Sequence, residues 1–186
     1  MQKTELKIRL LGDPGLRKKA HRILDITAQH RAILSQMAEL MYKRSGVGLA
    51  APQVGIDEQM IVVDIGEGLY KLINPRIIKR QGKQIIPEGC LSIPGITINV
   101  KRAKKIFLMA QDEYGKPLEI EAEDLLACVF QHEIDHLRGI LIVDYASFFE
   151  RLSLKKKIEE IKNKAKAKAE TKEVISYNNQ KKEGVF

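Results

Sequence analysis

The chain has 186 residues, of which 44% are hydrophobic and 30% are charged, and its net charge is +8. This length predicts a single domain that can bury a core without disulfides, which excludes a small disulfide scaffold. The two cysteines favour a reducing compartment. The sequence has no apolar run of about 18 residues and no signal or transit segment, so we expect a bacterial, cytoplasmic protein without membrane contact.

The first third of the chain carries one strand-like and one helical pattern. Residues 6–10 alternate between apolar and basic side chains, which predicts a strand. From about Thr27 to Lys43, apolar residues recur at helical spacing, and Ser45 and Gly46 end the pattern. The apolar positions of this predicted helix are Ile33, Leu34, Met37, Ala38 and Met41.

The middle of the chain has the pattern of short strands joined by tight turns. Met60–Ile65 and Leu69–Ile73 flank a glycine-rich turn, which predicts a hairpin whose second strand ends at Asn74 and Pro75. Strands with short turns, rather than alternating strands and helices, predict an α+β fold. We expect antiparallel sheets packed around one buried helix, with a further helix near each terminus. The remaining predicted strands are 96–100, 105–111 and 118–122.

The buried helix is predicted to have Asp124 as its N-cap and to stop at Gly139, and it contains His132, Glu133 and His136. Residues four apart share one face of a helix, so both imidazoles can reach one metal ion at about 2.0–2.1 Å. Glu133 is turned about 100° away and is better placed to hold a proton beside a metal-bound water. A core helix with two incidental histidines is the alternative, but burying these groups unpaired costs several kcal/mol.

A catalytic metal site normally needs a third protein ligand and keeps a fourth position for water. The extended zincin pattern would place that ligand at Ile142, which cannot bind a metal. Cys128 lies one turn before His132, and a span of roughly 12 Å to the second histidine prevents all three from sharing one ion. We therefore expect Cys128 to pack as a small apolar residue. Candidates that the residues alone leave open are Glu88, Cys90, Asp144 and Glu150, with His21 and His30 less favoured.

Two segments rich in small residues can complete the site. Pro87–Pro94 contains Cys90 among glycine and proline residues, which predicts an irregular loop able to carry both a ligand and an oxyanion hole. Gly46–Gly55 is small and apolar, so its backbone can approach a ligand closely. Gln53 in this segment can donate a hydrogen bond to an oxygen that develops negative charge.

The stretches GVGLAAPQ, EGCLS and QHEIDHL, in this order and roughly 40 residues apart, resemble the three motifs of the peptide deformylase family. The resemblance covers about residues 5–150. It implies a hydrolase that removes the formyl group from N-formylmethionyl nascent chains, with Cys90, His132 and His136 binding one divalent metal ion. Fe²⁺ is implied as the native ion, and Zn²⁺, Ni²⁺ or Co²⁺ can replace it.

The resemblance also implies roles around the metal. Glu133 would act as general acid and base, while Gln53 and the backbone N–H of Leu91 would stabilise the oxyanion. Because formyl differs from acetyl by one methyl group, we expect a tight slot that selects the substrate. The residues predicted to bind the substrate in this slot are Gly46, Val47, Gly48, Glu88, Cys128 and Val129.

The positive charge is concentrated at the C-terminus. We expect a catalytic domain at 1–147, a basic helix at 148–170 and a flexible tail at 171–186. Residues 151–186 carry 11 Lys and Arg against 5 Asp and Glu, so +6 of the net +8 lies there. A solvated helix would explain this charge, but the resemblance favours binding to the ribosome near its exit tunnel.

The helix that carries this charge has a defined start. Ser147 and Glu150 have the spacing of a capping box. Phe148 and Phe149 lie between these two residues and Leu152 follows them, and we expect all three to pack on the core.

Two other classes of protein share part of this pattern. A zincin-type peptidase would use the paired histidines but would have no use for Cys90. A non-enzymatic RNA-binding protein would explain the basic tail and leave His132 and His136 unexplained. The sequence therefore favours a deformylase-like metallohydrolase over both.

Overall fold

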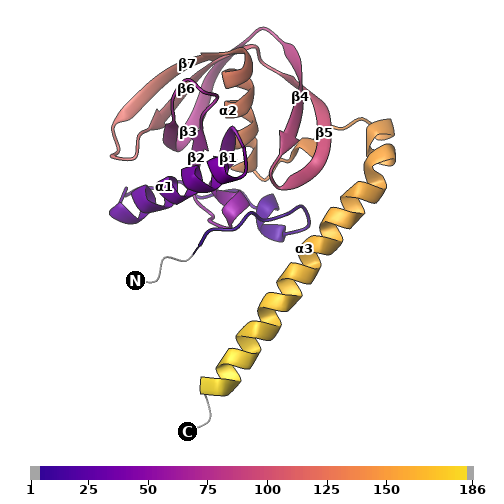
Figure 1. The fold of residues 1–186 in the computed structure, drawn as a ribbon. Helices are drawn as coiled ribbons and strands as arrows, with labels where there is room; N and C mark the ends of the chain where they lie inside the picture. Colours follow the sequence, from indigo (N-terminus) through magenta and orange to yellow (C-terminus); the bar gives the residue numbers. More distant parts are fainter. Residues whose placement is uncertain (1–4, 184–186) are drawn as a thin grey trace.

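The computed structural model describes residues 5–183, without the side chains of 168–183. Antiparallel strands form one five-stranded sheet in the order β1-β2-β3-β6-β7 and one two-stranded sheet, β4-β5 (Figure 1). The predicted α+β class is confirmed. The strands are β1 (Gly48–Ala50), β2 (Met60–Val63), β3 (Tyr70–Gln81), β4 (Gln84–Cys90), β5 (Ile93–Arg102), β6 (Lys105–Gln111) and β7 (Pro117–Glu123); the helices are α1 (Ala28–Lys43), α2 (Asp124–His136) and α3 (Phe148–Glu183), with short 3-10 helices at Pro14–Arg17, Ala51–Val54 and Ile142–Asp144.

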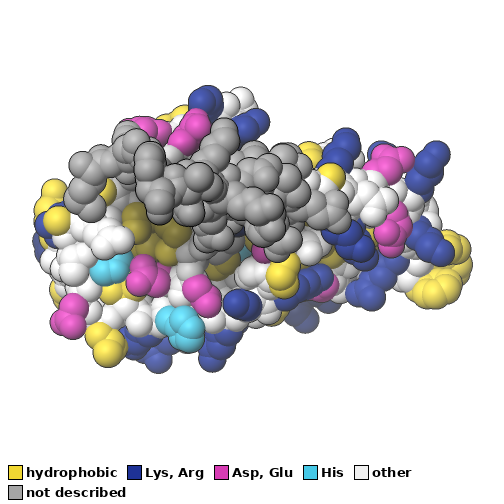
Figure 2. Space-filling view, turned by 90° about the horizontal axis from the view of Figure 1, so that it is seen from below, with side chains coloured by type: hydrophobic (Ala, Val, Ile, Leu, Met, Phe, Trp, Pro, Cys, Tyr) yellow, Lys and Arg dark blue, Asp and Glu magenta, His cyan; other side chains and the backbone are white. Residues whose placement is uncertain are grey.

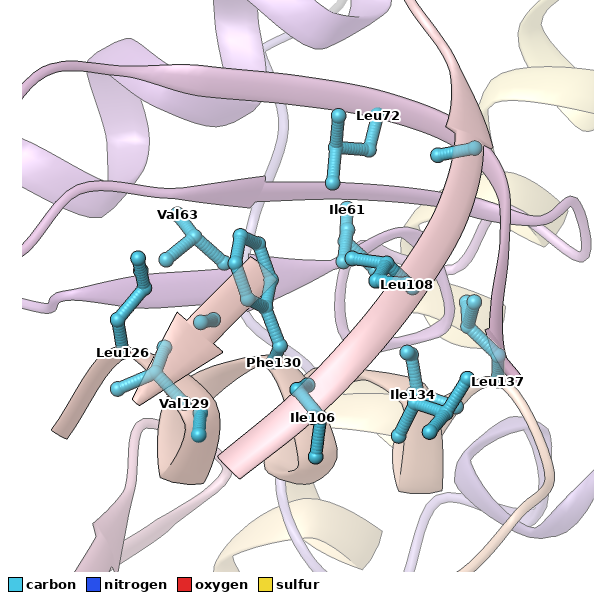
Figure 3. Packing of buried hydrophobic residues seen from close by; sticks show 14 of the residues in the cluster. Ile61, Val63, Leu72, Ile106, Leu108, Leu126, Val129, Phe130, Ile134 and Leu137 are labelled. Carbon is cyan, nitrogen blue, oxygen red and sulfur yellow. The ribbon is translucent and has the colours of Figure 1, made fainter. Parts of the chain in front are cut away.

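Helix α2 is the centre of the molecule and lies between the two sheets (Figure 1). Its apolar residues point at the larger sheet, where Phe130 and Ile134 meet side chains such as Ile61 and Leu108 (Figure 3). Phe130 and Ile134 lie four residues apart, so they occupy one helix face and leave His132 and Glu133 turned from it. The helix begins at Asp124, and Glu123 is its N-cap residue, one position before the predicted cap.

The larger sheet is buried on both faces around β2. Successive side chains of a strand point to opposite faces, so Ile61 and Val63 join the core with α2 while Met60 and Val62 face α1. Helix α1 matches the predicted helix and contributes Leu34, Met37 and Met41 to that second core. Strand β2 therefore holds the neighbouring strand β1 in a fixed position under α2.

The prediction of an irregular loop at Pro87–Pro94 was wrong. The segment forms the end of β4, a turn at Leu91 and Ser92, and the start of β5, with Cys90 opposite Ile93. The reason is burial on one side of this hairpin: Ile93 and other inward residues of β5 pack in a third hydrophobic cluster with Leu11 and Leu16. Cys90 is thus carried by a strand end rather than by a free loop.

Two further expectations about strands were wrong. Residues 6–10 form no strand; the chain there runs along the core, and the Arg9 N–H donates to the Gln53 carbonyl at 2.7 Å. Strand β3 does not end at Asn74 and Pro75 but continues to Gln81 through an irregular register. Asn74 adopts a φ of 53°, and its side chain hydrogen-bonds both the N–H and the carbonyl of Ile23, which stabilises this irregularity.

Helix α3 starts at the predicted capping box and runs past position 170 to Glu183. The Ser147 N–H donates to Glu150 at 2.8 Å, and the Glu150 N–H donates to the Ser147 hydroxyl at 3.3 Å. The expected packing of Phe148, Phe149 and Leu152 is wrong, because all three are exposed, the two phenylalanines by 75% and 80%.

A different stripe of α3 faces the body. Leu154, Ile158 and Ile161 recur at helical spacing and join the cluster under β5. Gly12 lies against this stripe, where an added Cβ would be 3.2 Å from the Lys162 Cα. Lys and Arg side chains gather on the side of the molecule where α3 begins (Figure 2). In the described part of the chain, no helix combines the length and apolar composition of a membrane span.

Candidate metal centre

Three side chains with metal-binding atoms meet between β4 and α2. One ligand atom each from Cys90, His132 and His136 lies within 4.8 Å of the other two. The Cys90 Sγ is 3.3 Å from the His136 Nε2, and the two imidazole rings are 5.0 Å apart at their centroids. Atoms bound tetrahedrally at 2.0–2.3 Å to one ion lie roughly 3.5 Å apart, so this set fits a single zinc-like or iron-like ion.

Glu88 fixes the orientation of the His132 ring through the ring nitrogen Nδ1. This Nδ1 lies 2.8 Å from the Glu88 Oε2, so Nδ1 carries the proton and Nε2 keeps its lone pair for a metal. Glu88 is itself held by Arg102, whose Nε and Nη2 donate to both carboxylate oxygens at 2.7 and 2.9 Å. Burial opposes the ionisation of Glu88, but hydrogen bonds from Arg102 and His132 lower its pKa to about 2.

Glu133 is buried beside the three candidate ligands. Its Oε1 approaches Gly48 of β1 so closely that a Cβ at that position would lie 2.3 Å away. Its Oε2 has no hydrogen-bond partner among the described residues, and the same holds for the His136 Nδ1. Burial raises the pKa of Glu133 to about 7. A buried carboxylate without a partner costs about 1–3 kcal/mol, which suits a group that acts on water or substrate rather than a structural one.

Gln53 points its amide nitrogen at the ligand cluster. Its Oε1 accepts a hydrogen bond from the Ala50 N–H at 2.8 Å, which fixes the orientation of the amide. The Nε2 therefore faces Cys90 Sγ at 3.5 Å and the Ser92 hydroxyl at 3.3 Å. Leu91 lies in the turn between these two residues. The two predicted oxyanion donors are thus adjacent to Cys90, one of the three candidate ligands.

A cavity of about 340 Å³ opens in front of this cluster. His136 is not among the residues that line this cavity, but its Nε2 contacts the Sγ of Cys90, which lines it. Sequence reasoning missed two apolar wall residues, Ile86 and Leu125, and Leu125 in particular offered only the signal of an apolar side chain on the polar side of α2. The predicted residues that line the cavity are Gly46, Val47, Gly48, Gln53, Glu88, Cys90, Leu91, Cys128, Val129, His132 and Glu133.

Two of these lining residues point their functional atoms away from a substrate. Both oxygens of Glu88 are occupied by Arg102 and His132. The Cys128 Sγ donates to Glu88 at 3.1 Å, and burial raises the pKa of this thiol to about 12. A thiol that stays protonated is a poor metal ligand. The structure therefore gives Glu88 and Cys128 supporting positions behind His132.

Arg102 is the main residue that sequence reasoning missed. It continues the buried phase of β5, since Ile96, Ile98 and Val100 are buried at the same alternation. An arginine at the inward phase of a strand signals a buried ion pair. Its second partner is Asp135, whose Oδ2 accepts from the Arg102 Nη1 at 2.5 Å.

Comparisons with known proteins agree on one family. The sequence profile described as polypeptide deformylase matches residues 5–152. The peptide deformylase of Halothermothrix orenii is 52% identical over 141 residues, which is 75% of this chain and 92% of that protein. The one from Thermoanaerobacter pseudethanolicus is 47% identical over 154 residues, covering 83% and 97%.

Solved structures show the same likeness. A peptide deformylase from Legionella pneumophila superposes with a TM-score of 0.81 at 39% identity, covering 86% of this chain and 96% of that one. A peptide deformylase from Synechococcus elongatus in complex with actinonin gives a TM-score of 0.79 at 41% identity, covering 87% and 88%.

Proposed function

This chain belongs to the polypeptide deformylase family, and we propose that Cys90, His132 and His136 hold the metal ion on which its activity depends. The family consists of metal-dependent enzymes that remove N-formyl groups from nascent peptides. One observation carries the assignment of the ligands: their three donor atoms lie within 4.8 Å of one another, beside a buried carboxylate. A zincin-type site is disfavoured because Ile142 packs in an apolar cluster.

We propose Fe²⁺ as the native ion, with Zn²⁺, Ni²⁺ or Co²⁺ as replacements. One thiolate and two imidazoles suit a borderline-soft divalent metal. Such an ion supplies Lewis acidity that polarises a carbonyl and makes water acidic enough to be deprotonated near neutral pH. An iron form should lose activity in air, because ferrous iron and the Cys90 thiolate are both oxidisable.

In this proposal Glu133 transfers the protons, and two hydrogen-bond donors stabilise the negative charge that develops on the carbonyl oxygen. Glu133 takes the proton from the attacking water and later returns it to the leaving amine. The carbonyl oxygen gains negative charge as water attacks the formyl carbon, and the Gln53 amide and the Leu91 N–H donate to it. Each donor is worth on the order of 3 kcal/mol in the transition state. The fixed Gln53 amide provides such stabilisation without reorganisation.

Specificity for formyl and for methionine comes from the shape of the cavity. Gly48 removes side-chain volume next to Glu133 and Gly46 removes it next to Leu91, so the backbone of this segment can approach a substrate closely. In this proposal the resulting slot accepts a hydrogen on the carbonyl carbon but not a methyl group. Val47, Leu125 and Val129 supply apolar wall. A methionine side chain that covers such a wall gains about 2 kcal/mol.

The basic helix α3 is proposed to bind the ribosome near its exit tunnel, where the nascent substrate emerges. Its described part exposes many lysines and few apolar residues other than Phe148, Phe149 and Leu152. Cations near ribosomal RNA speed association and make it sensitive to salt. Because formylated nascent chains are made in the bacterial cytoplasm, that compartment is the proposed location.

The ligand assignment is tested by the metal content of variants. Cys90→Ala and His132→Ala should each fall well below one equivalent of metal per chain, as measured by plasma mass spectrometry. Cys128→Ser is the matched control, because it changes the other buried thiol and keeps a donor to Glu88. Retention of a full equivalent by either ligand variant would disprove the assignment.

The role of Glu133 needs a separate variant. Glu133→Gln should keep the metal and lose turnover, because the amide preserves the shape of the side chain but cannot take a proton. If metal and turnover were lost together, Glu133 would be a ligand or a structural residue instead.

A further inference from the structure

A tyrosine outside the active-site cavity is connected to the metal ligands by hydrogen bonds. Tyr145 lies between the 3-10 helix Ile142–Asp144 and the start of α3, and it is 40% exposed. Its hydroxyl donates to the Asp135 Oδ2 at 2.7 Å. Burial and this carboxylate raise the pKa of Tyr145 to about 12, so the hydroxyl stays a donor at neutral pH.

The connection continues inward without a gap. The same Asp135 oxygen accepts from the Arg102 Nη1 at 2.5 Å. The other two guanidinium nitrogens, Nε and Nη2, donate to the two carboxylate oxygens of Glu88. The Glu88 Oε2 in turn contacts the His132 Nδ1 at 2.8 Å. Arg102 and Glu88 side chains are each 5% exposed, so solvent cannot replace these partners.

We propose that Tyr145 is a positioning residue for the metal ligand His132. This inference goes beyond the proposed function and rests on it in one respect, the role of His132 as a ligand. The planar guanidinium of Arg102 bridges two carboxylates, so rotation of the Asp135 carboxylate tilts the fork that holds Glu88. The Tyr145 hydroxyl is the second donor to Asp135 Oδ2, and it limits that rotation. Partners behind a ligating histidine commonly change metal affinity by 10–100-fold.

Tyr145→Phe isolates the hydroxyl. The ring remains, and with it the stacking of Arg102 at 4.8 Å from the ring centroid. The chain offers a matched control in Tyr42→Phe: Tyr42 is 50% exposed, and its hydroxyl donates to the Asp64 carboxylate at 2.6 Å without a link to the metal ligands. Both changes delete one hydroxyl-to-carboxylate hydrogen bond. Tyr145→Phe also removes the acceptor of a 3.3 Å hydrogen bond from the Arg102 Nη1, which belongs to the same network.

The measurement uses Co²⁺ as the probe. Full-length variants are loaded with cobalt, the visible absorption bands are recorded, and the Kd is obtained by competition with a chelator. Tyr145→Phe should weaken Co²⁺ binding by about 3–10-fold and alter the bands, as expected for a step more remote than Glu88 itself. Tyr42→Phe should stay within about twofold. Equal Kd values for Tyr145→Phe and the wild type would overturn the proposal, and so would equal effects of the two variants.

A double-mutant cycle separates this route from a general loss of stability. Glu88→Gln weakens the last link before His132, so adding Tyr145→Phe to it should change the cobalt Kd by less than in the wild type. Full additivity would show that the hydroxyl acts by another route and would overturn the proposal. Asp135→Asn breaks the same chain at its middle and should shift the bands in the same direction as Tyr145→Phe. His132→Ala that still binds one equivalent of Co²⁺ would instead refute the ligand assignment.

Discussion

Gly48→Ala is the sharpest test of how the fold holds Glu133. An alanine Cβ at this position would lie 2.3 Å from the Glu133 Oε1 and 2.9 Å from the Val129 Cγ1. Gly48 belongs to β1 and pairs with Val63 of β2, which is buried on both faces. The backbone cannot move away without breaking this ladder, so the Glu133 carboxylate must move instead.

The expected loss follows from the size of that movement. Ordinary contact between a methyl carbon and an oxygen is roughly 3.3 Å, so the carboxylate has to shift by about 1 Å. A misplacement of 1 Å in a catalytic group can reduce the rate about 100-fold, which equals about 2.7 kcal/mol. Overpacking should also lower the free energy of unfolding by about 1–3 kcal/mol.

The assay compares formate release from formyl-Met-Ala with metal content in the same preparation. Gly48→Ala should keep one equivalent of metal and lose about two orders of magnitude in kcat. Gly89→Ala is the control, because its φ suits alanine and no atom lies within 4 Å of an added Cβ. A folded Gly48→Ala protein with wild-type kcat would refute the close approach of β1 to Glu133.

Removing the chain after Lys162 keeps the packed stripe from Leu154 to Ile161, so turnover of a formyl dipeptide should stay within about threefold while ribosome binding weakens and its salt dependence flattens. Unchanged ribosome affinity would identify α3 as a solvated helix. Asp144→Asn should lower the free energy of unfolding in urea by about 1 kcal/mol at pH 7, after allowance for solvent screening. Burial opposes its ionisation, but Arg17 and the Leu141 N–H hold the pKa of Asp144 below its ordinary value, so this stability is present above about pH 4 and is lost as the pH falls through the folded-state pKa. A difference that persisted at pH 2 would contradict this reading. Formyl-Met-Ala should react far faster than acetyl-Met-Ala, and comparable rates would rule out a tight slot.

The sequence allowed the elements with regular periodicity to be predicted. Helices α1 and α2 and most strands follow from apolar spacing, because burial of one face determines that spacing. We predicted that strand β3 ends at Asn74 and Pro75, because a proline normally ends a strand. The strand continues, and only the tertiary contact of Asn74 with Ile23 explains why. The exposed Phe148 and Phe149 show that hydrophobicity alone does not locate a helix face.

The residues of the candidate site could be predicted where they belong to short sequence motifs. They could not be predicted where the site depends on contacts between distant segments. His132, His136 and Cys90 could be proposed from residue type and from family resemblance. The supporting partners could not, because Arg102 and Tyr145 carry no local signal of contact with Glu88 or Asp135. These contacts depend on how β5 and the segment before α3 pack against α2, which is a property of the tertiary structure.

The central place of α2 has a consequence for the order in which the molecule assembles during synthesis. This helix comes after every strand of the described chain, so it leaves the ribosome after all of them, yet the larger sheet packs on it. The strands made earlier have no partner for their inner faces until residue 136 has emerged, and long-range contacts of this kind slow folding. The N-terminal segment also depends on residues made this late, because the Ala20 N–H donates to the Leu137 carbonyl at 2.9 Å. A chain that ends before α2 therefore lacks the packing on the larger sheet and both histidines of the proposed metal site, and its exposed strands are a target for chaperones until α2 docks.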